Sequence, residues 1–226
     1  METINPNNYP ATRATGVVVN HINSKLGSPH RIFQVKEVTK ASKEIIEGVG
    51  DKYHLTFSMK DYLNERPPIN CTASVLYYLS EKRQAPDVTF QLQPQPENYT
   101  QDKDIEFYNN MYRMSPPLEA QDIPDKFGNV KPELEPVLHL ALVACDDVKW
   151  QHSTENTFFS MAVIKSVKQL KTEKKALQFH LNMLIHDIVS QEMIPWKIDI
   201  LWDPCQGLKV EYEERLPKCS HCEADP

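Results

Sequence analysis

The stretch Tyr53-His-Leu-Thr-Phe-Ser-Met59 alternates apolar and polar side chains residue by residue. Such alternation predicts a β-strand that buries one face and turns the other toward solvent. A second stretch, from Leu177 to Ile185, alternates in the same way. The chain is therefore expected to contain two half-buried antiparallel strands, and Tyr53 lies 126 residues before its counterpart Phe179.

The same offset of 126 residues aligns much of the two halves of the chain without gaps. A repeated pattern decides architecture, because each copy is one folding unit. The apolar pattern persists over more than about sixty positions, which predicts an internal duplication. The matched positions include Pro10 with Pro136, Val17 with Val143, Phe33 with Phe159, and His54 with His180.

Each half opens with a predicted helix. Pro10 suits a first helical turn, and Gly27 suits a C-terminal stop. Between them, a single apolar stripe is formed by Ala14, Val17, Val18 and Ile22. In the second half, the run Val137–Cys145 is apolar nearly all round. We expect that helix to be covered by its own sheet on one side and by the helix of the other copy on another.

In the first strand that follows each helix, the apolar residues switch from odd-numbered to even-numbered positions midway. Apolar residues stand at 33 and 35 and then at 38, and again at 159 and 161 and then at 164. One extra residue that shifts the parity indicates a β-bulge, which bends a sheet. Later strands are predicted near 69–78, 87–93, 196–202 and 208–213. The fold class is therefore α+β, with two units that each wrap a helix in a curved four-stranded antiparallel sheet.

A proline-rich segment separates the two halves, with seven prolines from Pro94 to Pro136. Proline lacks the amide donor, so continuous sheet or helix is excluded there. Inside the segment, Asp102–Met114 is free of proline and predicts a short helix with a stripe formed by Ile105, Tyr108, Met111 and Tyr112. The predicted domains are 1–97, a connecting segment 98–132, 133–217, and a tail 218–226.

Composition excludes several classes of function. The six glycines form neither a dinucleotide-binding nor a P-loop motif, and the net charge of −6 argues against nucleic-acid binding. The basic run from Lys165 to Lys175 is interrupted by Glu173 and predicts a solvated hairpin. No apolar run is long enough to span a membrane, and the N-terminus does not resemble a secretory signal. We therefore expect a cytoplasmic protein with reduced thiols, and unused glycosylation patterns at Asn70 and Asn98.

Two histidine and cysteine patterns raise the question of a metal site. Cys205, Cys219, His221 and Cys222 could supply four zinc ligands, but a polar tail with free thiols is the simpler interpretation. The matched His54 and His180 are interpreted as a duplicated surface residue, and His139 as a hydrogen-bonded core histidine. The chain also lacks the H-E-x-x-H and G-x-S-x-G motifs. We expect no enzyme activity, no catalytic residues, no cofactor and no metal.

A helix followed by a curved antiparallel sheet resembles the cystatin plan. Cystatins carry Q-x-V-x-G at their first hairpin, where this chain reads Glu44-Ile-Ile-Glu-Gly48, and Pro195-Trp196 resembles their second hairpin. Three longer strings resemble the latexin family of carboxypeptidase inhibitors: Pro117–Val130, Trp150–Glu155 and Ser190–Trp196. This resemblance implies two cystatin-like subdomains packed through their helices and joined by a segment with a third helix.

The resemblance also implies a function, which is inhibition of zinc-dependent A/B-type metallocarboxypeptidases by a monomer that occludes the active-site funnel from the seam between its subdomains. The implied protease-contact residues form one hairpin: His186, Asp187, Ile188, Val189, Ser190, Gln191 and Glu192. A rigid polar hairpin suits an interface rim, although the residues by themselves favour an ordinary polar turn. Two alternatives stay open: a cystatin-type cysteine-protease inhibitor that uses Glu44–Gly48, and a non-inhibitory interaction scaffold.

Overall fold

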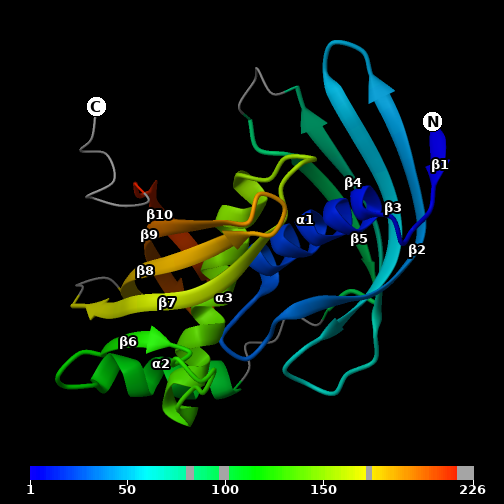
Figure 1. Ribbon diagram of the computed structural model, residues 1–226. Coiled ribbons are helices and arrows are strands. Elements are labelled where there is room, and N and C mark those ends of the chain that lie inside the picture. The colour runs from blue at the N-terminus through cyan, green and yellow to red at the C-terminus, as the bar shows by residue number, and fades with distance from the viewer. Residues whose placement is uncertain (80–83, 97–101, 172–174, 218–226) are drawn as a thin grey trace, which may run out of the picture. The chain divides into compact units, whose positions relative to one another are not determined.

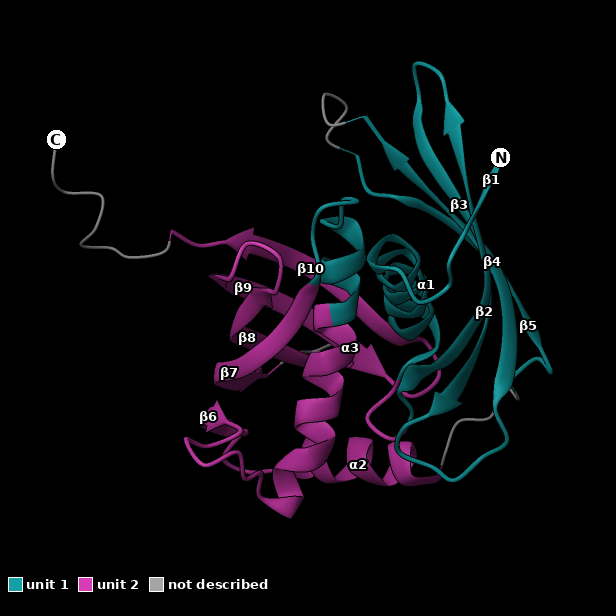
Figure 2. Cartoon of the chain, turned by 45° about the vertical axis from the view of Figure 1, so that its right-hand side comes forward, with its two compact units in different colours: residues 1–27, 31–99, 146–158 teal, residues 28–30, 100–145, 159–226 magenta. Residues whose placement is uncertain are grey.

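Two five-stranded antiparallel sheets and three α-helices make up the computed structural model (Figure 1), which describes residues 1–79, 84–96, 102–171 and 175–217. The predicted α+β class is confirmed. The chain divides into two compact units (Figure 2): unit 1 comprises residues 1–27, 31–99 and 146–158, and unit 2 comprises residues 28–30, 100–145 and 159–226. The domain boundaries expected from the sequence stay a prediction, as does the mutual covering of the two long helices.

Unit 1 consists of one helix and one meandering sheet. Its strands are β1 (Glu2–Ile4), β2 (Phe33–Ile46), β3 (Gly50–Asp61), β4 (Ile69–Tyr78) and β5 (Asp87–Gln93), and they lie in chain order across the sheet. The helix is α1 (Tyr9–Leu26), which has Pro10 in its first turn and ends where the Gly27 N–H donates to the Asn23 carbonyl at 2.8 Å. The predicted stripe of α1 is buried against the inner residues of the sheet, as expected.

Unit 2 repeats this plan. Its strands are β6 (Glu119–Ile123), β7 (Phe159–Leu170), β8 (Leu177–Asp187), β9 (Glu192–Asp203) and β10 (Gly207–Arg215), again in chain order across the sheet. Its helical parts are α2 (Asp102–Arg113), the short 3₁₀ helix η2 (Pro132–Leu134) and the first part of α3 (Glu135–Gln151). Residues 146–151 of α3 group with unit 1. The apolar run of α3 is largely buried.

Each first long strand carries the predicted irregularity. The pairing of β2 with β3 shifts between Val35 and Glu37 and again between Val38 and Lys40. The pairing of β7 with β8 shifts at 161/163 and 164/166, which are the same positions 126 residues later. The parity change in the sequence therefore did mark a β-bulge in both sheets.

Both sheets contain one strand more than the four expected. β1 pairs with Ala41–Lys43 of β2, and β6 pairs with residues 164–168 of β7. Both are short edge strands with mostly exposed side chains, so no hydrophobic alternation marks them. β6 also lies in the proline-rich segment, where its five residues fit between Pro117 and Pro124. The expectation of four strands was therefore wrong by one edge strand in each sheet.

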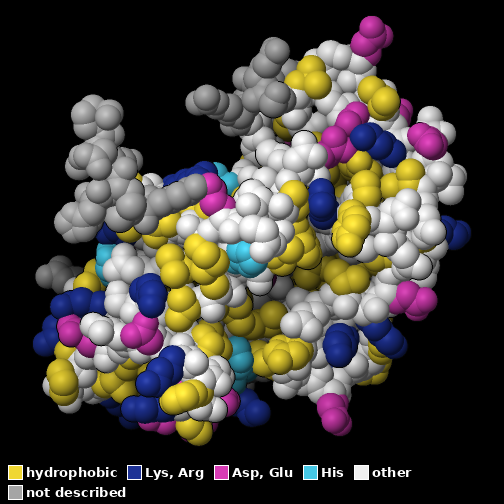
Figure 3. Space-filling model, in the orientation of Figure 1, with side chains coloured by type: hydrophobic (Ala, Val, Ile, Leu, Met, Phe, Trp, Pro, Cys, Tyr) yellow, Lys and Arg dark blue, Asp and Glu magenta, His cyan; other side chains and the backbone are white. Residues whose placement is uncertain are grey.

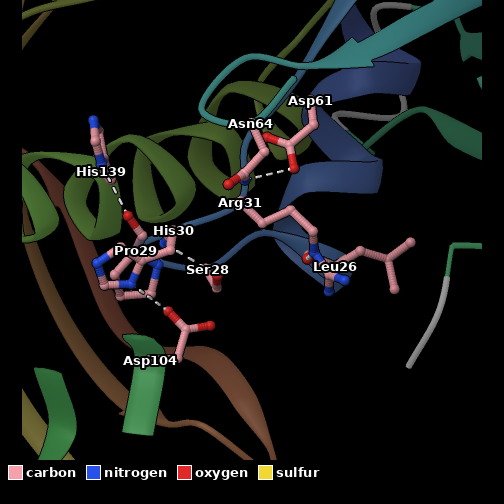
Figure 4. A network of polar contacts seen from close by, with 9 residues as sticks. All are labelled: Leu26, Ser28, Pro29, His30, Arg31, Asp61, Asn64, Asp104 and His139. Atoms are coloured by element: carbon pink, nitrogen blue, oxygen red, sulfur yellow. Dashed lines mark hydrogen bonds and ion pairs between the residues drawn. The ribbon is translucent and has the colours of Figure 1, made fainter. Parts of the chain in front are cut away.

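The connecting helix forms where predicted, but it buries a different face. α2 buries Asp104, Phe107 and Met111, whereas Ile105 and Tyr112 are exposed. The buried carboxylate has a partner, because Asp104 Oδ1 lies 2.8 Å from His30 Nδ1 (Figure 4). A charged side chain can be buried when such a pair compensates its lost hydration. The predicted stripe was therefore right for Met111 and wrong for Ile105 and Tyr112.

Two surface observations complete the description. On the face drawn in Figure 3, basic and acidic side chains are interspersed. In the predicted lysine hairpin, Lys165 pairs with Asp122 at 3.0 Å and Lys168 with Glu119 at 2.7 Å, while residues 172–174 lie outside the described residues. Among the described residues, no helix has the length and hydrophobicity needed to cross a bilayer.

Candidate functional site

The hairpin implicated by the resemblance connects two of the most buried strands of unit 2. Asp187 ends β8 and pairs with Glu192 at the start of β9, so residues 188–191 form the turn. Ile185, Ile194 and Trp196 bury the inner face of the two strands just behind it. The turn is therefore attached to a well-packed base, which limits how far it can move.

The turn itself is fixed by the side chain of Asp187, which is buried. One carboxylate oxygen of Asp187 accepts the Val189 N–H at 3.2 Å, and the other accepts the Ser190 hydroxyl at 2.7 Å. Gln191 adopts a left-handed backbone conformation with φ of 60°, and its side-chain amide donates to the Ile188 carbonyl at 2.6 Å. The turn is therefore organised before any partner binds.

Two of the four exposed residues of the turn are apolar. Ile188 is 40% exposed and Val189 is 43% exposed. In contrast, Ser190 is engaged with Asp187, and the Glu192 carboxylate lies 3.1 Å from the Arg215 guanidinium. The seven predicted residues thus lie together on one hairpin, whose exposed tip combines the apolar Ile188 and Val189 with Ser190 and Gln191, two polar residues that also make internal hydrogen bonds.

Sequence reasoning missed one neighbouring residue, Met193. It is 43% exposed and lies opposite His186 in the pairing of β8 with β9. The signal was in the parity of β9: Ile194 and Trp196 point inward, so Met193 must point outward. Met193 extends the exposed apolar surface from the turn onto the strand.

The cystatin-like stretch Glu44–Gly48 lies at the hairpin between β2 and β3 in unit 1. Ile45 is 77% exposed, and Gly48 has a positive φ of 69° that favours glycine. The Glu44 carboxylate lies 3.3 Å from His54 Nε2. The two sheets therefore each carry one hairpin with an exposed isoleucine.

Comparisons with known proteins support the resemblance to the latexin family. The sequence model described as Latexin matches residues 4–220. The chain belongs to the latexin family. It is 45% identical over 215 residues to latexin from Homo sapiens and to latexin from Mus musculus, covering 95% of this chain and 97% of each relative. It is 29% identical to ovocalyxin-32 from Gallus gallus over 213 residues, covering 94% of this chain and 76% of that protein.

Mouse fetuin-B is a more remote solved structure, with 9% identity and a TM-score of 0.30 over 97% of this chain and 71% of that chain. Membership of the latexin family supports the protease-inhibitor class that the resemblance implies, and a binding role rather than a catalytic one.

The string Trp150–Glu155 of this latexin-family chain anchors to the first sheet within unit 1. Lys43 Nζ lies 2.7 Å from Asp51 and 2.9 Å from Glu155, and the Tyr53 hydroxyl donates to the same Glu155 carboxylate. Burial and this hydrogen bond raise the pKa of Tyr53 to about 12, so the phenol stays protonated and keeps its role as donor. These four side chains pair with one another, so their role is to hold the segment Trp150–Glu155 against the first sheet.

Two of the described histidines make polar contacts that suit a structural role. His180 Nδ1 lies 2.5 Å from Asp199, and His139 Nδ1 lies 2.9 Å from the Pro29 carbonyl (Figure 4). Burial lowers the pKa of His139, which favours the neutral ring. The residue is hydrogen-bonded as expected, but it is half-buried rather than part of the core.

The cysteines give a mixed result. Cys71 and Cys145 are buried, and burial raises the pKa of Cys71 to about 12. Cys205 is exposed, whereas Cys219, His221 and Cys222 lie outside the described residues. Within the part of the chain that is described, no group of three or more His, Cys, Asp or Glu residues could hold a metal ion.

Proposed function

We propose that this chain inhibits zinc-dependent A/B-type metallocarboxypeptidases by covering the mouth of their active-site funnel. The observation that carries the proposal is the hairpin 186–192, whose pinned turn presents Ile188 and Val189 to solvent. Family membership supports the inhibitor class, and the hairpin supplies a defined surface for the contact. A cytoplasmic location and a monomeric state are further parts of this proposal.

The physical basis of such inhibition is steric exclusion of the substrate. A protein that covers an active-site opening needs no covalent chemistry and no metal of its own. The prior ordering of the turn by Asp187 reduces the entropy lost on binding. Burial of Ile188, Val189 and Met193 then contributes favourably at about 25 cal/mol per Å² of apolar surface removed from water.

The test measures inhibition of carboxypeptidase A on a small substrate with a C-terminal aromatic residue, with papain assayed in parallel. The double variant Ile188→Ser/Val189→Ser removes the apolar tip and leaves the Asp187 contacts intact. At a loss of about 1 kcal/mol for each side chain, inhibition of carboxypeptidase A should weaken at least about tenfold. Ile45→Ser is the matched control, because it makes the same change on the other exposed hairpin and should leave this inhibition unchanged.

Each outcome bears on one of the functions considered. If the variant Ile188→Ser/Val189→Ser inhibits carboxypeptidase A as strongly as the wild type, the enzyme contact lies outside this hairpin. Lack of inhibition of either enzyme would favour a non-inhibitory interaction protein.

The cystatin-type alternative has its own observation, the exposed Ile45 on the first hairpin. The carboxylate of Glu44, where cystatins carry glutamine, is paired with His54. Glu44→Gln should therefore create or strengthen papain inhibition if that hairpin is competent. Papain inhibition that Ile45→Ser removes would support this alternative over the carboxypeptidase proposal.

A further inference from the structure

The outer edge of β7 is only partly covered by its neighbour. β6 pairs with residues 164–168, beside the arrowhead half of β7 in Figure 1. Among the residues that the structure describes, no strand pairs with this edge along Phe159–Val163. An uncovered edge presents backbone N–H and C=O groups that can pair with another strand.

The equivalent edge in unit 1 shows how this fold protects such a position. β1 pairs only with Ala41–Lys43 and leaves the first half of β2 open, but that half carries Lys36, Glu37 and Lys40. Charged side chains on an edge discourage pairing with other chains. At the offset of 126 residues, Lys36 corresponds to Ala162 and Glu37 to Val163.

The correspondence between these positions is geometric as well as numerical. Lys36 and Ala162 are each the residue skipped at the first register shift of their strand, so both occupy the bulge. The stretch Phe159-Ser-Met-Ala-Val163 has no charged side chain. The β7 edge therefore shares the register shifts of the β2 edge but lacks its charged side chains.

A groove adjoins this unprotected edge, with a volume of about 810 Å³. Its floor includes Ala162 and Val163, and its other wall is the loop 124–128 that follows β6. The Asp125 carboxylate orders this loop by accepting the backbone N–H groups of Phe127 at 2.9 Å and Asn129 at 2.8 Å. The ordered loop holds Phe127 with 77% of its surface exposed. Aromatic side chains are enriched in protein interfaces.

The four charged side chains that line the groove differ in their partners. Asp122 pairs with Lys165 at 3.0 Å, and the carboxylate of Asp125 is occupied by the backbone of its own loop. Lys126 Nζ lies 5.0 Å from the centre of the Phe127 ring and forms no ion pair among the described residues. A partner that fits the groove is therefore expected to bring a negative charge to this end.

We propose that the edge Phe159–Val163 and the loop 124–128 bind an extended peptide strand of a partner protein by strand addition. The backbone of the partner would pair with the open edge of β7, and its apolar side chains would contact Phe127. An acidic residue at the end of the strand beside Lys126 completes the charge complementarity. This binding surface is separate from the inhibition proposed above, because its ligand is a strand rather than an enzyme active site.

The test uses fluorescein-labelled peptides of alternating threonine and valine with a glutamate at one end, and fluorescence anisotropy on the full chain. Two peptides carry the glutamate at opposite ends, because the strand could add in either direction. Matched peptides carry N-methyl groups on alternate residues, which remove the backbone donors, or lysine in place of glutamate. We expect binding of at least one glutamate peptide, and at least tenfold weaker binding of its methylated and lysine forms.

The decisive variant is Ala162→Lys/Val163→Glu, which copies the protected β2 edge onto β7. Because a lysine already occupies the equivalent bulge at Lys36, the fold should tolerate it, and circular dichroism checks this. Binding should fall at least tenfold, whereas Lys36→Ala should leave it unchanged. Lys126→Glu should reverse the preference between the glutamate and lysine peptides.

Three results would overturn the proposal. The first is that no peptide binds to the wild-type chain. The second is that Ala162→Lys/Val163→Glu binds as tightly as the wild type. The third is that the chain forms dimers in sedimentation experiments and that the same double variant abolishes them, which would assign the edge to a second copy of this chain.

Discussion

Asn23 is a buried polar residue whose removal should markedly lower the stability of the fold. It lies on α1, is 2% exposed, and its side chain joins three backbone elements of unit 1. Its amide nitrogen donates to Asp146 Oδ2 at 2.7 Å and to the Phe33 carbonyl at 3.0 Å, and its amide oxygen accepts the Phe33 N–H at 2.9 Å. Asn23→Ala would leave all three partners short of one bond.

The expected magnitude follows from these three hydrogen bonds. A neutral hydrogen bond contributes about 1 kcal/mol net, and a bond to a charged group contributes about 2 kcal/mol. Phe33 and Asp146 are buried, so water cannot readily replace the lost partner. Asp146 keeps its ion pair with Lys149 at 2.5 Å, which limits the loss at that end. We expect Asn23→Ala to lower the free energy of unfolding by about 4 kcal/mol.

Urea unfolding followed by tryptophan fluorescence measures this loss. With a slope of about 3 kcal/mol per molar urea, the midpoint should fall by more than about 1 M. Asn20→Ala is the matched control, because Asn20 lies on the same helix and makes no side-chain hydrogen bond among the described residues. Asn23→Asp keeps the volume of the side chain and should also destabilise, since it places a second carboxylate beside Asp146. A loss below about 1 kcal/mol for Asn23→Ala would refute this assignment.

Two further predictions concern unit 1. His21 packs 4.1 Å from Trp150 between ring centroids, and burial, with a smaller contribution from Lys25, lowers its pKa to about 4. The His21 ring takes up a proton at about pH 6.5 in the unfolded chain and at about pH 4 in the folded chain. The contribution of neutral His21 to the free energy of unfolding is therefore complete above about pH 6.5 and is lost as the pH falls toward about 4. The loss is about 2 kcal/mol after allowance for solvent screening. Urea unfolding across this range should show the slope in the wild type and a flatter profile in His21→Gln; equal slopes would contradict it. Gly50 has a φ of 153°, and a Cβ added there would lie 1.9 Å from the Tyr77 carbonyl oxygen. Gly50→Ala should therefore lower the free energy of unfolding by about 2 kcal/mol or more. A Cβ added at Gly48 would meet no atom within 4 Å, so Gly48→Ala should be affected only by the φ of 69° at that position. A smaller loss in thermal unfolding for Gly50→Ala than for Gly48→Ala would show that the β3–β4 pairing yields at this position.

Regular alternation was the most informative signal in the sequence. β4 and β5 begin and end at the predicted residues 69–78 and 87–93, because their inward side chains are apolar at every second position. The bulges were visible for the same reason, since a shift of parity is a local property of the chain. β1 and β6 were missed because short exposed edge strands need no hydrophobic pattern and form only where a partner edge is available.

The candidate hairpin was located by the sequence, but its surface chemistry was not. Asp187 and Glu192 bound the turn where the alternating strands stop. Which side chains remain free depends on internal contacts that the spacing does not reveal. Ser190 is held by Asp187, and Glu192 by Arg215 from the neighbouring strand, so Ile188 and Val189 are the exposed side chains of the turn that make no such polar contact.

The sequence by itself determined the two helix-plus-sheet units, the bulged strands, the position of the hairpin and, through its long irregular strings, the family. These are local or repeated patterns, in which the period of apolar residues reports the geometry of one element. Only the tertiary structure decided which polar residues are buried and which edges stay open. Asp104 is buried because His30, 74 positions earlier in the chain, meets it, and the β7 edge is open because β6 stops at Ile123. Such contacts join residues that are far apart in sequence, so no local pattern encodes them.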